Sequence, residues 1–246
     1  MGTVTAVVSG KGGTGKTTTV AVVASCLASR GHRTLCIDCD VGLKNLDINL
    51  GLSGLTNIDF NDVMSGEAAL DDAVLEHPEI ENLFFLSSPT TAEPEDIDPD
   101  GMKALLDEVR EKFEYCFIDA PAGIGSGFRL AASFADAAIV VAAGDALSMR
   151  DCQRAVSELQ KLGIKNVRLV VNRVKPQFFA AMDATLDEMI DTVGARLLGV
   201  VEDDDTVSLA LNSEIPLILC DSTKAMREFN RISLRIEGFD APVRLK

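Results

Sequence analysis

Basic residues are scarce in this chain. Only 23 of its 246 residues are lysine or arginine, against 38 aspartates and glutamates, so the formal net charge is −15 and the isoelectric point lies near 4.5. Proteins that bind nucleic acid without sequence preference rely on lysines and arginines that release counterions from phosphates. The composition therefore argues against a nucleic-acid partner, although it leaves room for a local basic patch.

Long apolar runs are missing as well. The longest candidate, residues 131–143, is interrupted by Asp136 and falls short of the ~18 apolar residues of a membrane-spanning helix. Nor does the N-terminus join a basic segment to an apolar one, as a secretory signal does. We expect a cytoplasmic protein without a spanning helix.

No low-complexity linker divides the chain, and its 47% hydrophobic content suffices for one buried core. We expect a single domain over residues 1–246, in which residues 238–246 form a short C-terminal tail. Strands are predicted at residues 3–8, 33–38, 83–86, 115–119, 138–142, 167–172, 197–201 and 216–220. Helices are predicted at residues 16–29, 101–112, 126–134, 146–162, 181–192, 204–212 and 222–236. This alternation predicts the α/β class: a doubly wound, mainly parallel sheet with helices on both faces.

The most informative segment lies between the first strand and the first helix. Residues 10–17 read GKGGTGKT and fill the phosphate-loop pattern G-x-x-x-x-G-K-[ST]. Glycines let successive backbone N–H groups converge on phosphate oxygens at the positive end of the helix. Lys16 would neutralise the β- and γ-phosphates, and Thr17 would offer its hydroxyl to Mg²⁺. The fold is thus expected to be of the P-loop NTPase type. The residues expected to hold the nucleotide in this segment are Gly10, Lys11, Gly12, Gly13, Thr14, Gly15, Lys16, Thr17 and Thr18.

The same loop carries a second lysine, Lys11. A lysine near the start of the loop cannot easily reach its own γ-phosphate, which Lys16 already serves. In a face-to-face dimer it could reach the nucleotide of the partner subunit, so that hydrolysis would depend on dimerisation. The alternative is a solvated lysine on an exposed loop.

Acidic residues close two of the predicted strands. Asp119 ends the apolar strand at 115–119, the form of a Walker B element whose carboxylate supports Mg²⁺, and a glycine-rich segment able to sense the γ-phosphate follows at 120–125. Asp38 and Asp40 close the second strand, where one carboxylate can hold the loop or the hydration of Mg²⁺ and the other can orient the attacking water. Strand-end turn chemistry is the alternative for either aspartate. Ligands of such sheets bind beyond the carboxyl ends of the strands, where these acids, the phosphate loop and Asn172 all fall.

Six cysteines lie in or beside apolar runs, as expected of small buried side chains in a reducing compartment. Cys36 and Cys39 have the C-x-x-C spacing. Because this motif lies at a strand end rather than at a helix start, a redox or metal function is not favoured.

Three segments together resemble the deviant Walker A ATPases, the MinD/ParA family. They are KGGTGKTT at 11–18, DCDVGLKNLD at 38–47 and DAPAGI at 119–124. The GLKNLD piece is a feature of the MinD type rather than of the family at large. The resemblance runs nearly end to end and implies an ATP-dependent dimerising switch ATPase that regulates the placement of the cell-division site by recruiting partners. It implies ATP or ADP and Mg²⁺ as ligands, and slow hydrolysis without an activating partner.

The resemblance also assigns roles to individual residues. It makes Lys11 the signature lysine that acts across the dimer, and Lys16 and Thr17 the ligands of phosphate and Mg²⁺. Asp40 would be the switch I residue that positions water beside the metal, and Asp119 would support Mg²⁺ and lead switch II. In the same way Asn172 is expected to bind the adenine amino group and Arg173 to cover the base.

The implied partners are a second copy of the chain and MinC-like, MinE-like or other division and positioning proteins. The partner-binding helix of the family is expected to begin S-x-R-D-x-D-R, but here Gln153 replaces the second acid, and Glu202 stands where a proline is usual. A positioning ATPase like ParA or FlhG, or a redox ATPase like the nitrogenase iron protein, are the alternatives. The redox alternative lacks paired cysteines beside the segment at 119–125.

Relatives of the MinD type usually end in a basic amphipathic helix that inserts at the membrane surface, and here only residues 238–246 follow the last predicted helix. That helix carries an apolar stripe of Met226, Phe229, Ile232 and Ile236 beside arginines on another face. We expect the stripe to dock on the core, because a terminal helix must complete the layer over the sheet. Peripheral association with the inner face of the cell membrane stays open.

Overall fold

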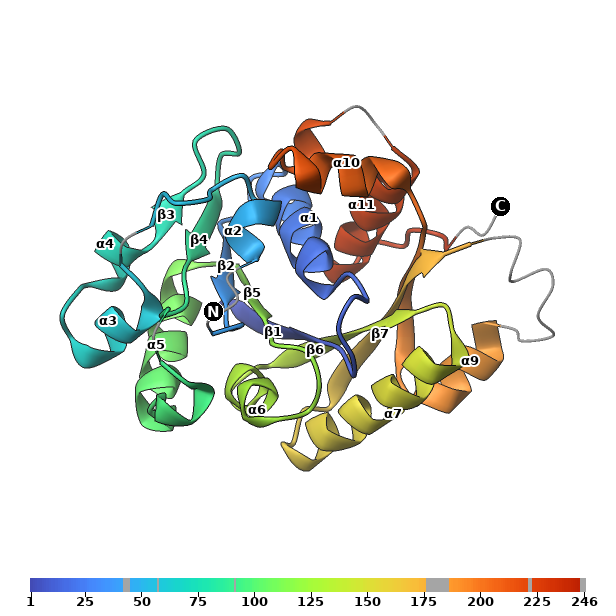
Figure 1. The fold of residues 1–246 in the computed structure, drawn as a ribbon, viewed down its shortest axis with the longest axis horizontal. Helices are drawn as coiled ribbons and strands as arrows, with labels where there is room; N and C mark the ends of the chain where they lie inside the picture. The colour runs from blue at the N-terminus through green and yellow to red at the C-terminus, as the bar shows by residue number, and fades with distance from the viewer. Residues whose placement is uncertain (42–44, 57, 91, 176–185, 221–222, 244–246) are drawn as a thin grey trace.

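The structure is a computed structural model that describes residues 1–41, 45–56, 58–90, 92–175, 186–220 and 223–243. Its centre is a sheet of eight strands in the order β3-β4-β2-β5-β1-β6-β7-β8 (Figure 1). The strands are β1 (Thr3–Val8), β2 (Thr34–Asp38), β3 (Leu75–Glu76), β4 (Leu83–Leu86), β5 (Tyr115–Asp119), β6 (Ala137–Ala143), β7 (Asn166–Val174) and β8 (Arg196–Glu202). All neighbours pair in parallel except β3, which runs antiparallel to β4.

Helices cover both faces of this sheet (Figure 1). The described helices are α1 (Lys16–Ala28), α2 (Leu46–Asn49), α3 (Phe60–Ser65), α4 (Leu70–Ala73), α5 (Pro99–Lys112), α6 (Ser126–Ala132), α7 (Ala146–Lys161), α9 (Leu186–Val193), α10 (Asp205–Asn212) and α11 (Lys224–Ile236). Successive strand residues point to opposite faces, so Val8 joins the core under α5, α6 and α7, whereas Val7 joins the core under α1 and α11. The predicted doubly wound α/β fold is confirmed.

The last helix docks on the sheet as expected. Phe229 and Ile232 of α11 are fully buried and pack against α1 and β8. Gly199 of β8 permits this contact, because a Cβ there would lie 2.3 Å from Cγ1 of Ile232. The apolar stripe is therefore part of the core. No helix among the described residues is long and apolar enough to span a bilayer.

Two parts of the prediction were wrong or incomplete. Residues 216–220 do not form a strand; a 3₁₀ turn, Leu217–Leu219, follows Pro216, and its N–H groups bond back within the turn. Leu217 is buried but Leu219 is exposed, so this apolar run does not fill both faces of a sheet as a central strand would. The short elements α2, α3, α4 and β3 were not predicted, and residues 181–185 and 222 of two predicted helices lie outside the described residues.

Candidate nucleotide site

The phosphate loop has the backbone that its glycines were expected to provide. Gly13 and Gly15 have φ of 77° and 87°, values that favour glycine. Gly15 is also the N-cap of α1, and no side chain caps that helix end. A Cβ at Gly15 would lie 2.1 Å from Nδ2 of Asn172. The first turn of α1 therefore presents N–H groups and the positive end of the helix dipole to any ligand above the loop.

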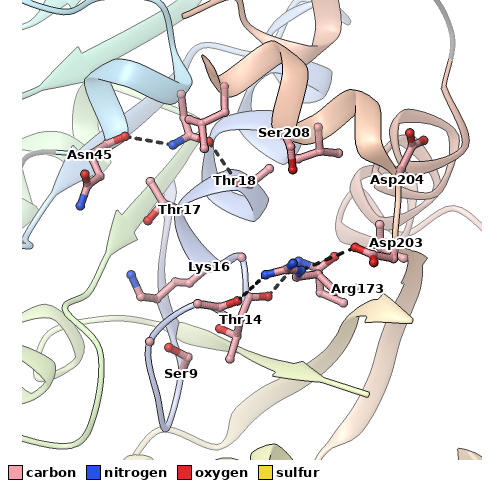
Figure 2. A pocket seen from close by; sticks show the side chains of 18 of the residues that line it. Ser9, Thr14, Lys16, Thr17, Thr18, Asn45, Arg173, Asp203, Asp204 and Ser208 are labelled. Atoms are coloured by element: carbon pink, nitrogen blue, oxygen red, sulfur yellow. Dashed lines mark hydrogen bonds and ion pairs between the residues drawn. The ribbon is translucent and has the colours of Figure 1, made fainter. Parts of the chain in front are cut away.

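The loop opens into a cavity of about 770 Å³ at the carboxyl end of the sheet. Its walls come from the loop, the end of β7, the end of β8, α10 and the chain that follows β2 (Figure 2). We call this last part, residues 40–49, the switch segment; Asp40, Asn45, Ile48 and Asn49 of it line the cavity. The predicted residues that line it are Gly12, Gly13, Thr14, Gly15, Lys16, Thr17, Thr18, Asp40, Asn172 and Arg173. Segments far apart in sequence thus meet at the edge where a parallel sheet binds its ligands.

Lys16 and Asp119 form a buried ion pair at the base of the loop. Nζ of Lys16 lies 2.8 Å from Oδ1 of Asp119, and the two side chains are 7% and 1% exposed. Burial raises the pKa of Asp119, and the Lys16 ammonium and the Thr17 hydroxyl oppose this rise. Asp119 does not line the cavity, whereas Lys16 lines the cavity and also contacts Asp119.

The two aspartates of the second strand have different positions. The carboxylate of Asp38 is fully buried and accepts backbone N–H groups from Asp40 (2.8 Å), Asn45 (3.3 Å) and Leu46 (3.2 Å). Burial, with Asp119 on the neighbouring strand as the next cause, raises the pKa of Asp38 to about 7. Asp38 therefore performs the strand-end turn chemistry and holds the switch segment, while half-buried Asp40 lines the cavity.

Asn172 and Arg173 grip the loop from β7. Nδ2 of Asn172 donates to the Thr14 carbonyl (2.9 Å), which leaves its Oδ1 as an acceptor beside the cavity. Arg173 has φ of 55° and donates from Nη1 to the Gly13 carbonyl at 3.2 Å, while its Nε lies 3.6 Å from Oδ1 of Asp203 (Figure 2). A non-glycine residue in this backbone region is strained, and such strain concentrates at functional sites.

Gly10 and Lys11 are not among the residues that line the nucleotide cavity. A Cβ at Gly10 would lie 2.4 Å from the backbone of Asp151, so this glycine permits the loop to pack against α7. Nζ of Lys11 lies 3.1 Å and 3.3 Å from the carboxylate oxygens of Asp145, the residue that caps α7. Lys11 instead lines an adjoining cavity of about 550 Å³ between the loop and the start of α7, which shares Gly12, Gly13, Arg173 and Asp203 with the nucleotide cavity.

The residues present fit a nucleotide with Mg²⁺. Among the described residues, Oγ1 of Thr14 is buried inside the loop without a hydrogen-bond partner and no side chain caps the N-terminus of α1, so both can take an external group. The described residues hold no cluster of three or more acidic, histidine or cysteine side chains that could bind a metal alone. Mg²⁺ typically keeps waters and takes one or two protein ligands plus substrate phosphates. The Thr17 hydroxyl and the Asp40 carboxylate line the cavity and are oxygen donors of the kind that Mg²⁺ takes, whereas Asp119 does not line it.

Several residues of the site were not found from the sequence. Oγ1 of Thr18 donates to Oδ1 of Asn49 (3.0 Å), and Nδ2 of Asn49 donates to the Asn45 carbonyl (3.0 Å), which joins α1 to the switch segment. Val207 and Leu211 of α10 add apolar surface to the cavity wall. The place of α10 beside the cavity could have been inferred from the chain order. The helix follows β8, so it starts at the carboxyl edge of the sheet, where the cavity lies.

The cysteines give no support to a redox function. All six are free. Cys36 and Cys39 are fully buried, and desolvation raises the pKa of both thiols, which suppresses the reactive thiolate.

Comparisons with known proteins agree with this geometry. A family model described as the CobQ/CobB/MinD/ParA nucleotide binding domain matches residues 5–217. The septum site-determining protein MinD of Thermotoga maritima is 34% identical over 246 residues, which cover 99% of this chain and 91% of the relative.

Two solved structures share the fold over nearly the whole chain. The MinC:MinD cell division protein complex of Aquifex aeolicus contains a chain with TM-score 0.91 and 28% identity, with 99% of both chains covered. The septum site-determining protein MinD of Pyrococcus horikoshii, complexed with Mg-ADP, has TM-score 0.84 and 25% identity, with 96% of both chains covered. Taken with the loop and the residues that converge on it, these likenesses show that the chain belongs to the MinD group of the CobQ/CobB/MinD/ParA family of nucleotide-binding proteins.

Proposed function

We propose that this protein is an ATP-dependent switch ATPase of the MinD type, which dimerises with ATP and places the cell-division site by nucleotide-controlled recruitment of partners. It converts ATP and water to ADP and phosphate, slowly without an activating partner. The observation that carries the proposal is the convergence of an uncapped helix N-terminus, Lys16 and Asp40 on one cavity. We also treat residues 1–246 as a single domain, because β1 to β8 share one sheet.

Phosphate binding falls to the loop. Its backbone N–H groups and the end of α1 favour negative charge, and Lys16 supplies the only lysine on the cavity wall among the described residues. Thr17 and Thr18 follow in the first turn of α1, where Thr17 is placed to offer its hydroxyl to the metal. Loss of Lys16 therefore removes the cation that the loop itself supplies to this cavity.

Hydrolysis needs a positioned water more than a strong base, because phosphoryl transfer depends mainly on alignment and charge stabilisation. Asp40 lines the cavity, and the backbone around it is fixed by the buried Asp38 carboxylate. Bound Mg²⁺ would neutralise charge on the phosphate oxygens. Asp119 holds Lys16 in place from behind the loop and supports the metal side of the site.

Dimerisation is inferred from the position of the second lysine. Lys11 does not line its own nucleotide cavity, and its one ion-pair partner in the described part of the chain is an aspartate that is 52% exposed. The side chain is thus free to exchange this weak surface pair for a phosphate of a facing subunit. The position of Lys11 therefore supports a dimer in which the γ-phosphate bound by one chain is also contacted by Lys11 of the other chain.

For partners, the Aquifex aeolicus MinC:MinD complex makes a MinC-like protein the first candidate, and the resemblance adds a MinE-like activator. We infer a cytoplasmic location, and any contact with the inner face of the cell membrane would fall to the tail, because the apolar stripe of α11 is buried. Sedimentation with anionic vesicles, with and without ATP, tests this. Co-sedimentation only with ATP would support membrane association, and its absence in both arms would contradict it.

Calorimetry with ATP, ADP and GTP tests the nucleotide assignment. We expect ATP and ADP to bind and GTP to bind more weakly, because Oδ1 of Asn172 can accept from the adenine amino group. Asn172→Asp is the informative variant, since it keeps the acceptor but loses the donor to the loop. Absence of ATP binding by the parent protein, with an intact fold shown by circular dichroism, would overturn the proposal.

A further inference from the structure

A cavity of about 530 Å³ lies at the end of the sheet opposite the nucleotide site. It is formed by the last turn of α7, the turn that follows, and the starts of β7 and β8, whose other ends reach the nucleotide site (Figure 1). Its lining residues are Gln160, residues 163–168 and residues 194–196. We call it the basic cavity.

The charge of this cavity contrasts with that of the chain. Lys165, Arg168 and Arg196 line it, and none of the described residues that line it is acidic, although the chain as a whole carries a net charge of −15. Within the described residues, none of these three side chains forms an ion pair. Arg168 donates from Nε to Oδ1 of Asn166 (3.2 Å), a neutral acceptor.

The two arginines are held next to each other by the sheet. Arg168 and Arg196 are register partners on the parallel strands β7 and β8, so their side chains leave the same face of the sheet. Two like charges that leave the same face of neighbouring strands repel each other. This repulsion does not favour the fold, whereas two neighbouring guanidinium groups supply N–H donors that can bind an oxyanion.

The neighbouring helix ends offer a structural reason for the three basic residues that involves no ligand. α7 ends at Lys161 and α9 at Val193, and Gly163 (φ 86°) and Gly194 (φ 73°) follow them at the cavity. Helix C-termini favour nearby cations. However, none of the three basic side chains donates to a carbonyl of either helix end among the described residues. The helix ends therefore offset part of the positive charge of the three side chains, but in the described part of the chain they do not accept hydrogen bonds from them.

We propose that the basic cavity binds a small anion that carries two or more phosphate groups. Arg168 and Arg196 would grip one phosphate as a pair of forks, and Lys165 would act on the second as a point charge. The volume lies in the ~300–1,000 Å³ range of small-ligand sites. This site is separate from the nucleotide cavity and does not depend on the function proposed above.

The test is a titration of the full ¹⁵N-labelled chain with sodium pyrophosphate, followed by two-dimensional NMR. Saturating ADP occupies the phosphate loop, and residue-resolved signals distinguish the two sites in any case. The reporters are the Nε–Hε groups of Arg168 and Arg196 and the amides of Gly163 and Gly194. We expect saturable shifts at these reporters, and weaker binding of citrate, which has similar charge but no phosphate.

Variants identify the groups that bind. Arg168→Gln and Arg196→Gln should each weaken pyrophosphate binding about tenfold or more, Arg196→Lys should lose less because it keeps the charge, and the exposed Arg227→Gln on α11 is the matched control with no change. Absent or non-saturating shifts at the reporters, or equal affinity in the Arg196→Gln and Arg227→Gln proteins, would overturn the site. Equal binding of citrate would overturn its assignment to phosphate. Since the glutamines relieve like-charge repulsion, their thermal midpoints should not fall below that of the parent.

Discussion

Lys11→Ala gives the sharpest test of the dimer mechanism. In the structure the Lys11 ammonium pairs with Asp145 of its own chain, and the two side chains are 33% and 52% exposed. A pair this exposed contributes at most about 1 kcal/mol. A charge-assisted contact buried between two subunits costs about 2–5 kcal/mol when one partner is truncated. The contact across the dimer should therefore outweigh the pair within the chain.

We expect Lys11→Ala to bind ADP as the parent does and to weaken the ATP-dependent dimer by more than about tenfold, since about 1.4 kcal/mol corresponds to a factor of ten. Asp145→Asn is the matched variant. It removes the competing charge but can still accept from the Ser148 N–H that caps α7. Freed from this partner, Lys11 should strengthen the dimer by at most about fivefold, which corresponds to about 1 kcal/mol.

Sedimentation velocity with a non-hydrolysable ATP analogue, over a concentration series at matched nucleotide occupancy, measures both variants. Equal dimer fractions for the parent and Lys11→Ala would show that Lys11 is a solvated loop lysine. If Asp145→Asn weakened the dimer as much as Lys11→Ala does, the dimer would depend on the Lys11–Asp145 pair within each chain rather than on a contact of Lys11 across the dimer. Either result would refute the action of Lys11 across the dimer.

Three further predictions concern the nucleotide site and the pH dependence of folding. Lys16→Ala should abolish ATP binding in calorimetry and lower the free energy of unfolding by about 3–5 kcal/mol in urea titrations, because it leaves Asp119 buried and unpaired; unchanged ATP affinity would contradict the loop assignment. Asp40→Ala should bind ATP and dimerise but not hydrolyse it, and phosphate release at the parent rate would remove Asp40 from catalysis. His32, bonded to Glu114 (2.9 Å) and Glu237 (2.8 Å), has a pKa raised above 6.5 chiefly by the Glu114 hydrogen bond. Its stabilising contribution is therefore complete below pH 6.5 and lost as the pH rises through the folded-state pKa, so the free energy of unfolding should fall over that range in the parent and not in His32→Asn.

The elements predicted well from the sequence are those whose signal is local. The loop at residues 10–17 combines glycines, a lysine and a threonine in a fixed order between a strand and a helix, so its backbone and its place at the sheet edge follow from neighbouring residues alone. The central strands β1, β5 and β6 were found for a similar reason, because parallel strands buried on both faces are continuous apolar runs. These elements place most of the candidate site.

The rest depended on contacts that the sequence does not display. α2 and α4 span four residues each, which is too short for helical periodicity, and β3 has two residues that pair with β4 at the edge of the described sheet. The partner of Lys11 lies 134 positions away in the chain. The spacing of Asp38 and Asp40 placed both at a strand end, but only the fold shows that one holds three backbone N–H groups and the other faces the cavity.

The buried aspartates at the base of the nucleotide site lower the stability of the fold. Asp38 and Asp119 are register partners on β2 and β5, both almost fully buried, and burial raises the pKa of each. The Lys16 ammonium pairs with Asp119, and three backbone N–H groups satisfy Asp38. Apolar residues of similar size would pack here without the desolvation penalty. Each acid instead has a role in the chemistry proposed above: Asp119 holds the lysine that meets phosphate, and Asp38 fixes the segment from which Asp40 reaches the cavity. The protein thus gives up stability where positioning of charge matters most.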